Sequence, residues 1–507
     1  FNTVNISRCK LIDLMHSGKR SESVRFKNPA VCGIVFVLSG CALSYAYYMV
    51  VTKGNMLDRF TFIAMIVIGA VSTFLIFWSA AGFLLNIVQR MKKFYHRGLN
   101  TFTFRQIASR INTMILSMTI ICLMLFVTIC TLASSFSVRN NLNENITKLC
   151  PADFEIVYEA EAGYNDIISA YKQHSIPLTE HFKEYVHFHA YEDPELTLAV
   201  FLGDYLETVM EQYRFILYET AETIVSLSDY NRLMELYGKE PLSLEEDEFI
   251  LLCDFTSMKQ IRDERLKDMK TLEIMGHDLK PKYRECQDGF VDITSQHINI
   301  GIYVVPDSVA DETYAAEDYF IGNYAAETKK EKESVEEIVR REFDEFSAAI
   351  AADLAAGRIA NYHLMFNTKI DIVQASVGLG ALFTFLGLYI GIVFLISCGA
   401  ILALKELSGD VDSIGRYQML RKLGVEERDI RGSLFAQTGI FFLLPLLLAI
   451  VHSVFGMQYA NGILSGQLAF GDGEALQSYL TTGGVILVIY GGYFLVTYLS
   501  GKEIIKS

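Results

Sequence analysis

Scattered histidine and acidic side chains in the polar part of the chain are the residues that could bind a metal. His187 and His189 alternate along one stretch, and Glu192 follows them. Imidazole and carboxylate groups together are ligands for zinc-type metals. The sequence places no further ligand at a defined spacing, however, and its nine cysteines form no CxxC or Cys/His pattern. We therefore expect no metal site and no cofactor bound by this chain.

The motifs of nucleotide binding and hydrolysis are also absent. A phosphate-binding loop requires G-x-x-x-x-G-K-[ST], and the nearest fragment, Gly501-Lys502-Glu503, lacks the first glycine and the hydroxyl. Neither an HExxH sequence nor a nucleophile elbow is present. We expect that the chain is not an enzyme, and that any ATP and Mg²⁺ are bound by a separate ATPase.

The most informative stretch combines an apolar run with a charged segment. Residues 372–404 carry no charge, and at about 1.5 Å per residue a helix of this length exceeds the roughly 30 Å hydrocarbon core. The following segment, 405–433, contains apolar residues at helical spacing: Tyr417, Leu420, Leu423 and Ile430. Gly424 stands where a short helix needs a C-terminal cap. The pattern predicts a short amphipathic helix, a turn and the start of another membrane helix.

Such a charged turn between two spanning helices has two interpretations. It could grip a soluble partner at the membrane face, or it could be an ordinary loop whose apolar residues touch lipid headgroups. Spacing alone does not decide between them.

The same segment resembles a known family. Tyr417-Gln-Met-Leu-Arg-Lys-Leu-Gly-Val, with Ile430 and Gln437 after it, resembles the hallmark of the FtsX/MacB-type ABC-transporter permeases. Residues 12–22 and 105–114 are similar to the BceB-type branch, which acts in antimicrobial-peptide resistance and sensing. The resemblance covers nearly the whole chain outside residues 139–369. It implies that an ATPase docks on the turn through these residues: Tyr417, Leu420, Arg421, Lys422, Leu423, Gly424 and Ile430.

The resemblance also implies a function and partners. It implies a permease subunit that works with a dimeric cytoplasmic ABC ATPase and with a membrane sensor histidine kinase. The outer domain would engage a peptide antibiotic of the bacitracin or lantibiotic kind, or its complex with a lipid-linked cell-wall precursor. Alternatives are an FtsX-like regulator of a cell-wall hydrolase and a MacB-like machine for lipoproteins or efflux. The ligand-binding residues are unknown, and no nucleic-acid partner is expected.

Composition indicates a membrane protein with a large polar domain. Of the 507 residues, 51% are hydrophobic and 20% are charged, and the mean hydropathy is +0.27. Residues 139–369 hold 22 Lys/Arg and 46 Asp/Glu, whereas the remainder holds 22 and 13. Because basic segments stay in the cytoplasm, we expect residues 139–369 to form an acidic extracellular domain.

Six apolar runs predict six membrane-spanning helices: 30–51, 60–88, 114–136, 372–404, 434–455 and 480–499. The expected fold class is an α-helical polytopic membrane protein with an α+β extracellular domain inserted between its third and fourth helices. The chain would divide into a cytoplasmic segment, 1–28, three helices, 29–138, the extracellular domain, 139–369, and three helices with the coupling turn, 370–507. Loop 89–110 contains six Lys/Arg and no acid, which predicts that this loop and, with six spans, both ends lie in the cytoplasm. The family resemblance implies that the membrane is the bacterial plasma membrane.

The interiors of the six runs contain no Asp, Glu, Lys or Arg. A charge at mid-bilayer is costly and usually marks an ion path, so a channel or secondary transporter is disfavoured. His452 is expected to be a hydrogen-bonded packing residue. Gly387 and Gly391 fit close contact between two membrane helices.

Within the polar insert, alternating apolar residues predict strands at 153–159, 196–202, 249–255 and 298–305. Helical stretches are expected at 221–236 and 258–270. Apolar spacing over 327–365 predicts a long helix running into the fourth span, either as a lever or packed on its own domain. Of the three cysteines here, Cys150, Cys253 and Cys286, at most one pair can form a disulfide.

The start of the chain carries no initiator methionine and no signal peptide. Members of the BceB-type branch have four further helices and a first permease module ahead of this position. We therefore expect that the chain is the C-terminal part of a longer protein.

Overall fold

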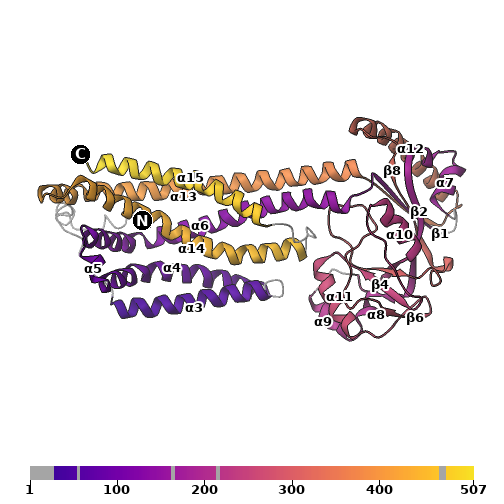
Figure 1. The fold of residues 1–507 in the computed structure, drawn as a ribbon, viewed down its shortest axis with the longest axis horizontal. Coiled ribbons are helices and arrows are strands. Elements are labelled where there is room, and N and C mark those ends of the chain that lie inside the picture. Colours follow the sequence, from indigo (N-terminus) through magenta and orange to yellow (C-terminus); the bar gives the residue numbers. More distant parts are fainter. Residues whose placement is uncertain (1–27, 54–57, 162–165, 213–216, 467–474, 507) are drawn as a thin grey trace. The chain divides into compact units, whose positions relative to one another are not determined.

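The structure is a computed structural model that describes residues 28–53, 58–161, 166–212, 217–466 and 475–506 (Figure 1). The chain divides into two compact units. The helical unit comprises residues 1–129, 392–455 and 485–507, and the sheet unit comprises residues 130–391 and 456–484. Residues 1–27 of the expected cytoplasmic segment lie outside the described residues.

Among the described residues, six helices are long and apolar enough to cross a membrane. They are α3 (Pro29–Lys53), α4 (Arg59–Arg90), α6 (Asn100–Leu149), α13 (Lys369–Lys422), α14 (Glu427–Gly466) and α15 (Ala475–Ile504). A short helix, α5 (Lys92–Tyr95), lies between α4 and α6. The sheet lies between the third and fourth of the long helices in the chain. The predicted fold class is confirmed.

Two of these helices extend further than their apolar runs predict. Helix α6 begins at Asn100, so much of the expected loop 89–110 is helical. Helix α13 runs unbroken to Lys422, so the expected separate amphipathic helix is the last part of α13. No proline interrupts that part, and a helix can continue beyond the bilayer. The helix ends before Gly424, whose φ of +83° favours glycine.

Nine described strands form one mixed sheet in the order β5-β6-β4-β7-β3-β2-β8-β1-β9. The strands are β1 (Phe154–Glu161), β2 (Phe182–Thr197), β3 (Ala221–Ser226), β4 (Glu248–Leu252), β5 (Leu272–Ile274), β6 (His277–Pro281), β7 (Ile302–Val305), β8 (Ala315–Tyr324) and β9 (Asn361–Thr368). Strands β1 and β9 are antiparallel neighbours, with Phe154 opposite Thr368. Because β1 follows α6 and β9 precedes α13, the strands next to these two helices in the chain are paired.

Short helices connect the strands: α7 (Ile167–Gln173), α8 (Leu198–Leu202), α9 (Leu206–Gln212), α10 (Leu227–Leu236), α11 (Thr256–Asp268) and α12 (Lys329–Ala355), with the 3₁₀ turns η3 (Leu178–His181), η4 (Gly203–Tyr205) and η5 (Glu312–Tyr314). The expected strand 196–202 is mostly helix α8, because Thr197 caps a helix there. The expected helix 221–236 begins as β3, and only its second half, capped by Ser226, is helical.

Helix α12 does not run into the fourth span, so that prediction is wrong. It begins with a capping box between Thr328 and Glu331 and ends at Ala355, before Gly357 with a φ of +69°. Strand β9 then follows. The buried ring of Phe346 stacks on Tyr171, with ring centroids 3.9 Å apart. Helix α12 therefore packs on its own domain.

A buried ion pair fixes α11 to the sheet. Nη2 of Arg262 donates to both carboxylate oxygens of Glu222 on β3, at 2.8 and 2.7 Å. Nη1 lies 3.3 Å from the hydroxyl of Tyr303 on β7. Both charged side chains are buried. The three expected extracellular cysteines, Cys150, Cys253 and Cys286, are buried free thiols.

Within the helical unit, His452 links α14 to the first two helices. Its Nδ1 lies 2.6 Å from the hydroxyl of Tyr47 on α3, and its Nε2 lies 3.0 Å from the hydroxyl of Thr73 on α4. The interpretation as a hydrogen-bonded packing histidine is confirmed. In the sheet unit, Gly387 and Gly391 of α13 face α6, where a Cβ would overlap Ser135 and approach Leu132.

Candidate functional site

The turn between α13 and α14 rests on a small buried cluster. Tyr417 and Ile430 are fully buried there with Leu434 and Ile505. The ring of Phe102, on α6, meets that of Tyr417 edge-on at 5.7 Å. Some of the apolar residues whose spacing suggested a partner-binding face are therefore buried in the protein's own core.

The outer side of the turn presents a different set of side chains. Leu423 is 75% exposed and Met419 is 64% exposed. Exposed charged residues lie close to them in the sequence: Lys422, Glu426, Glu427 and Arg428. Exposed apolar residues rimmed by charge are typical of a protein-binding surface. We call Met419 and Leu423 the apolar knob.

The seven residues that the family resemblance assigned to ATPase coupling thus separate into three groups. Tyr417 and Ile430 are buried. Leu420 and Arg421 are partly buried, and Nη1 of Arg421 donates to the carbonyl of Ile505 at 2.7 Å. The exposed remainder is Lys422, Leu423 and Gly424. Helical spacing alone does not separate these groups, because a short amphipathic stretch has the same period whichever face is buried.

A ladder of polar side chains lies beneath the turn. Nε2 of Gln437 donates to the hydroxyls of Tyr417 and Ser433, at 3.1 and 3.0 Å. The hydroxyls of Ser433 and Thr103 lie 2.6 Å apart. These contacts join α6, α13 and α14, and all four side chains belong to buried residues.

Further along α13 lies a buried ion network. Arg110 of α6 donates from Nη1 to Glu406 at 2.7 Å and from Nη2 to Asp410 at 3.0 Å. Both carboxylates have no exposed surface. Nη2 also lies 3.2 Å from the hydroxyl of Ser413, and Thr438 of α14 donates to Glu406 at 3.4 Å. The network therefore fastens three helices below the turn.

Sequence reasoning missed this network. Its members lie just outside the uncharged runs 114–136 and 372–404, so Arg110 was assigned to a loop and the acids to the turn. One feature of the sequence could have indicated the network: Glu406 and Asp410 are spaced i,i+4, so that both carboxylates lie on one face of a helix. One guanidinium serves two carboxylates, and one oxygen of each carboxylate has no hydrogen-bond partner. The arrangement is an ion network that holds helices together. It includes neither a nucleophile nor a set of metal ligands.

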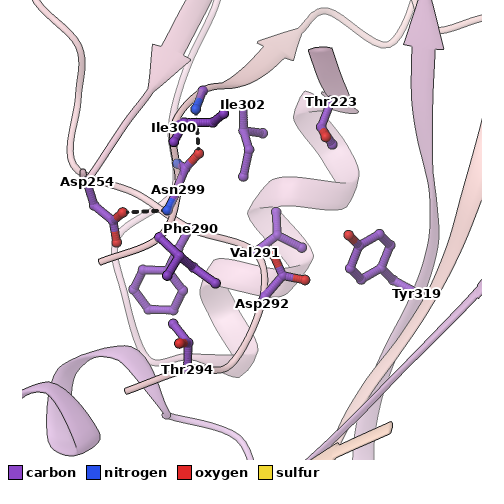
Figure 2. Close-up of a pocket in the computed structure, with 12 residues that line it drawn as sticks. Thr223, Asp254, Phe290, Val291, Asp292, Thr294, Asn299, Ile300, Ile302 and Tyr319 are labelled. Carbon is purple, nitrogen blue, oxygen red and sulfur yellow. Dashed lines mark hydrogen bonds between the residues drawn. The ribbon is translucent and has the colours of Figure 1, made fainter. Parts of the chain in front are cut away.

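The sheet unit contains a second candidate site, an acidic pocket (Figure 2). Asp254, Asp292, Phe290 and Tyr319 line it, and its volume is about 170 Å³. The backbone N–H of Asn299 donates to Asp254 at 2.8 Å. A larger hollow of about 770 Å³ shares Asp254 and Phe290 and adds basic and acidic side chains: Lys148, Lys239, Lys259, Asp263 and Asp288.

Comparison with known proteins identifies the relatives of this chain. No family model matches it. The ABC transporter permease protein YxdM of Bacillus subtilis is 21% identical over 471 residues, which are 92% of this chain and 66% of that protein. The bacitracin export permease BceB of Bacillus subtilis is 28% identical over 147 residues, 29% of this chain and 21% of that protein. The chain is a homologue of BceB-like ABC-transporter permeases.

Another BceB, from Halalkalibacterium halodurans, is 27% identical over 139 residues, 27% of this chain and 20% of that protein. The present chain thus spans about two-thirds of YxdM and about a fifth of each BceB protein. The six long apolar helices agree with a multi-pass membrane protein, as the names of these permeases indicate.

In the acidic pocket of the sheet unit the carboxyl groups are shifted toward the protonated state. Burial, and then the nearby charge of Glu317, raises the pKa of Asp292 from 3.8 to about 6. Burial, followed by the charge of Asp292, raises the pKa of the neighbouring Glu155 well above its usual value. A cationic group in the pocket would relieve this repulsion.

These shifts predict a pH-dependent stability. The folded state binds the proton of Asp292 more tightly than the unfolded chain, so this stabilising contribution is present below about pH 3.8 and is lost as the pH rises through about 6. We expect Asp292→Asn to raise the melting temperature at about pH 8 and to have little effect at about pH 4. The pKa shift from 3.8 to about 6 is about two units, and at about 1.4 kcal/mol per unit the expected gain is about 3 kcal/mol at most. Thermal melts of wild type and variant across this range test it, and a gain that is independent of pH would contradict it.

Proposed function

We propose that this chain is the membrane subunit of an ABC transporter and that a separate cytoplasmic ATPase docks on the turn between α13 and α14. The observation that carries this proposal is the apolar knob. Met419 and Leu423 project from a turn whose base is fixed by the buried Tyr417 cluster. A rigid base with an exposed apolar tip suits the transmission of force from a partner.

The connectivity of α13 supports a mechanical role. The helix is continuous from Lys369 to Lys422, and it begins directly after β9, whose neighbour β1 follows α6. We propose that displacement of the turn by the ATPase is transmitted along α13 to this strand pair. Such coupling requires that the ATPase contacts differ between two conformations of the permease.

We further propose that the sheet unit binds a cationic antimicrobial peptide, alone or with a lipid-linked cell-wall precursor, and that a membrane sensor histidine kinase joins the complex. Residues 139–369 carry 46 acidic and 22 basic residues, and complementary charge speeds encounter with a cationic ligand. Asp254 and Asp292 place part of that charge in a pocket. The BceB relatives are bacitracin export permeases, which agrees with a peptide ligand. We propose that both ends of residues 1–507 lie in the cytoplasm.

Purification of the protein from membranes of its native host in mild detergent tests the proposal. We expect an ABC ATPase to co-purify, with an activity that changes when cationic cell-wall-active peptides are added. An ATPase that co-purifies with a cell-wall hydrolase and ignores peptides would instead support an FtsX-like regulator. The absence of any ATPase would contradict the proposal.

The apolar knob gives a sharper prediction. The double variant Met419→Asp/Leu423→Asp should lose ATPase association at least tenfold while keeping the wild-type melting temperature, because both side chains are exposed. Leu423→Met is the matched control and should bind normally. Tyr417→Ala provides the contrast, since removal of a buried ring should lower the melting temperature as well. Quantitative co-purification and thermal melts measure both effects, and normal ATPase binding by the double variant would contradict the docking site.

A further inference from the structure

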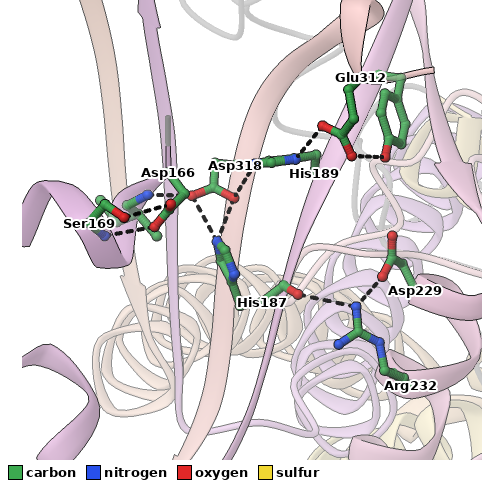
Figure 3. A network of polar contacts seen from close by, with 10 residues as sticks. Asp166, Ser169, His187, His189, Asp229, Arg232, Glu312 and Asp318 are labelled. Atoms are coloured by element: carbon green, nitrogen blue, oxygen red, sulfur yellow. Dashed lines mark hydrogen bonds and ion pairs between the residues drawn. The ribbon is translucent and has the colours of Figure 1, made fainter. Parts of the chain in front are cut away.

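Two histidines and an aspartate, residue types that commonly bind metal ions, lie close together on two neighbouring strands of the sheet unit (Figure 3). His187 and His189 are two residues apart on β2 and therefore point to the same face. Asp318 lies on β8, directly opposite His189 in the antiparallel register. The backbone N–H of Ile167, the first residue of α7, donates to Oδ2 of Asp318. Three elements thus meet at this carboxylate.

The distances among the three side chains suit a shared cation. Oδ1 of Asp318 lies 2.8 Å from Nε2 of His187 and 3.4 Å from Nε2 of His189. The three ligand atoms all lie within 4.8 Å of one another. Two ligands at 2.0–2.1 Å from a tetrahedral zinc ion are about 3.3 Å apart. Small side-chain adjustments therefore bring all three atoms into coordination distance of one ion.

Two of these ligand atoms are left without a hydrogen bond in the structure. Oδ1 of Asp318 and Nε2 of His189 are both buried and make no hydrogen bond. Their contacts are ion-pair contacts, 2.8 Å from Oδ1 to Nε2 of His187 and 3.4 Å from Oδ1 to Nε2 of His189. Asp318 is only 4% exposed. A buried polar atom without a hydrogen bond is costly and calls for an explanation. A bound cation would satisfy both atoms at once.

We propose that His187, His189 and Asp318 bind one divalent transition-metal ion of the zinc type, with water in the fourth tetrahedral position. Glu312 supports this assignment, because its Oε2 lies 3.0 Å from Nδ1 of His189. A carboxylate on one ring nitrogen fixes the tautomer and directs the other nitrogen to the metal. The ion would fasten β2 to β8 at the first turn of α7.

The carboxylate ligand differs from the one that the sequence suggested. Glu192 is not in the cluster, and Asp318 lies more than a hundred residues further along the chain. Asp166 lies close by, but its carboxylate already accepts hydrogen bonds from the N–H and hydroxyl of Ser169. The metal site proposed here therefore has three protein ligands.

The test uses the full chain purified in detergent and stripped of metal with a chelator. Cobalt(II) is titrated in and followed by its visible absorption, and zinc is then added to displace it. We expect one tetrahedral cobalt per chain, displaced by zinc, and a rise in melting temperature with zinc. His189→Ala should abolish both signals. His277→Ala, at an exposed histidine on β6, is the matched control and should behave as wild type.

Glu312→Gln keeps the test informative if ligand variants fail to fold, because this side chain is largely exposed. It should weaken cobalt and zinc binding roughly 10- to 100-fold without changing the melting temperature of the metal-free protein. Wild-type protein that takes up no stoichiometric cobalt or zinc would overturn the proposal and leave His187 and Asp318 as an ion pair. Equal loss of binding in His277→Ala would also overturn it.

Discussion

The Arg110→Met variant is expected to lose about 3–5 kcal/mol of stability and most of its yield of folded protein. Arg110 is the cation that the structure places between Glu406 and Asp410, which have no exposed surface. Without it, two buried carboxylates face each other, and neither has another cationic partner among the described residues. Size-exclusion profiles of the fluorescently tagged protein after heating measure the loss.

The companion variant separates charge from packing. Arg110→Met combined with Glu406→Gln and Asp410→Asn removes all three charges and should recover much of the lost stability, because neutral side chains of similar volume avoid the buried charge. A single Arg110→Met variant that melts like the wild type would show that the ion network does not hold α6 against α13.

The second large effect is expected in the sheet unit. Glu222→Ala should destabilise the sheet unit by about 3–5 kcal/mol, because it leaves the fully buried guanidinium of Arg262 without its carboxylate partner. The guanidinium would keep only the hydroxyl of Tyr303 and the ring of Phe201, whose centroid lies 4.9 Å away. Thermal or denaturant unfolding followed by a probe in the sheet unit measures the change.

A paired replacement again provides the control. Glu222→Leu with Arg262→Met removes both charges and should be markedly more stable than Glu222→Ala alone, since the pair costs desolvation in its own right. If the single variant were as stable as wild type, the ion pair would not be what fixes α11 to β3 and β7.

The membrane architecture was predictable because it depends on local hydropathy. An uncharged run such as 372–404 must leave water wherever it lies in the fold, so six runs correctly predicted six long helices. The bounds were less predictable. The sequence of residues 405–422 does not indicate that α13 continues through them. A charged amphipathic segment has the same composition whether it extends a membrane helix or forms a separate short helix.

The ion network shows what the sequence could not reveal. Arg110 and Glu406 are 296 positions apart, and their burial depends on how α6 approaches α13. In sequence, Arg110 is one of six basic residues in a polar stretch. Long-range pairing of this kind is a property of tertiary packing.

For residues 139–369, the sequence predicted the α+β fold class but not the positions of most strands and helices. Strand β1 and helix α11 appeared close to the predicted positions, but the apolar run 196–202 is mostly helix, because short apolar runs do not distinguish strand from buried helix. The same limit applies to the coupling residues. Tyr417 and Leu423 both belong to the apolar pattern of 417–430, yet Tyr417 is buried and Leu423 is exposed.

The central claim is that the tip of the turn between α13 and α14 contacts an ATPase. A photoreactive amino acid at position 423, in the full-length protein in native membranes, tests this contact directly. Position 476, at the start of α15, is also exposed and provides the control. We predict that irradiation cross-links position 423 to an ABC ATPase subunit and that position 476 gives no such product. No ATPase adduct from position 423, or equal adducts from both positions, would contradict the account.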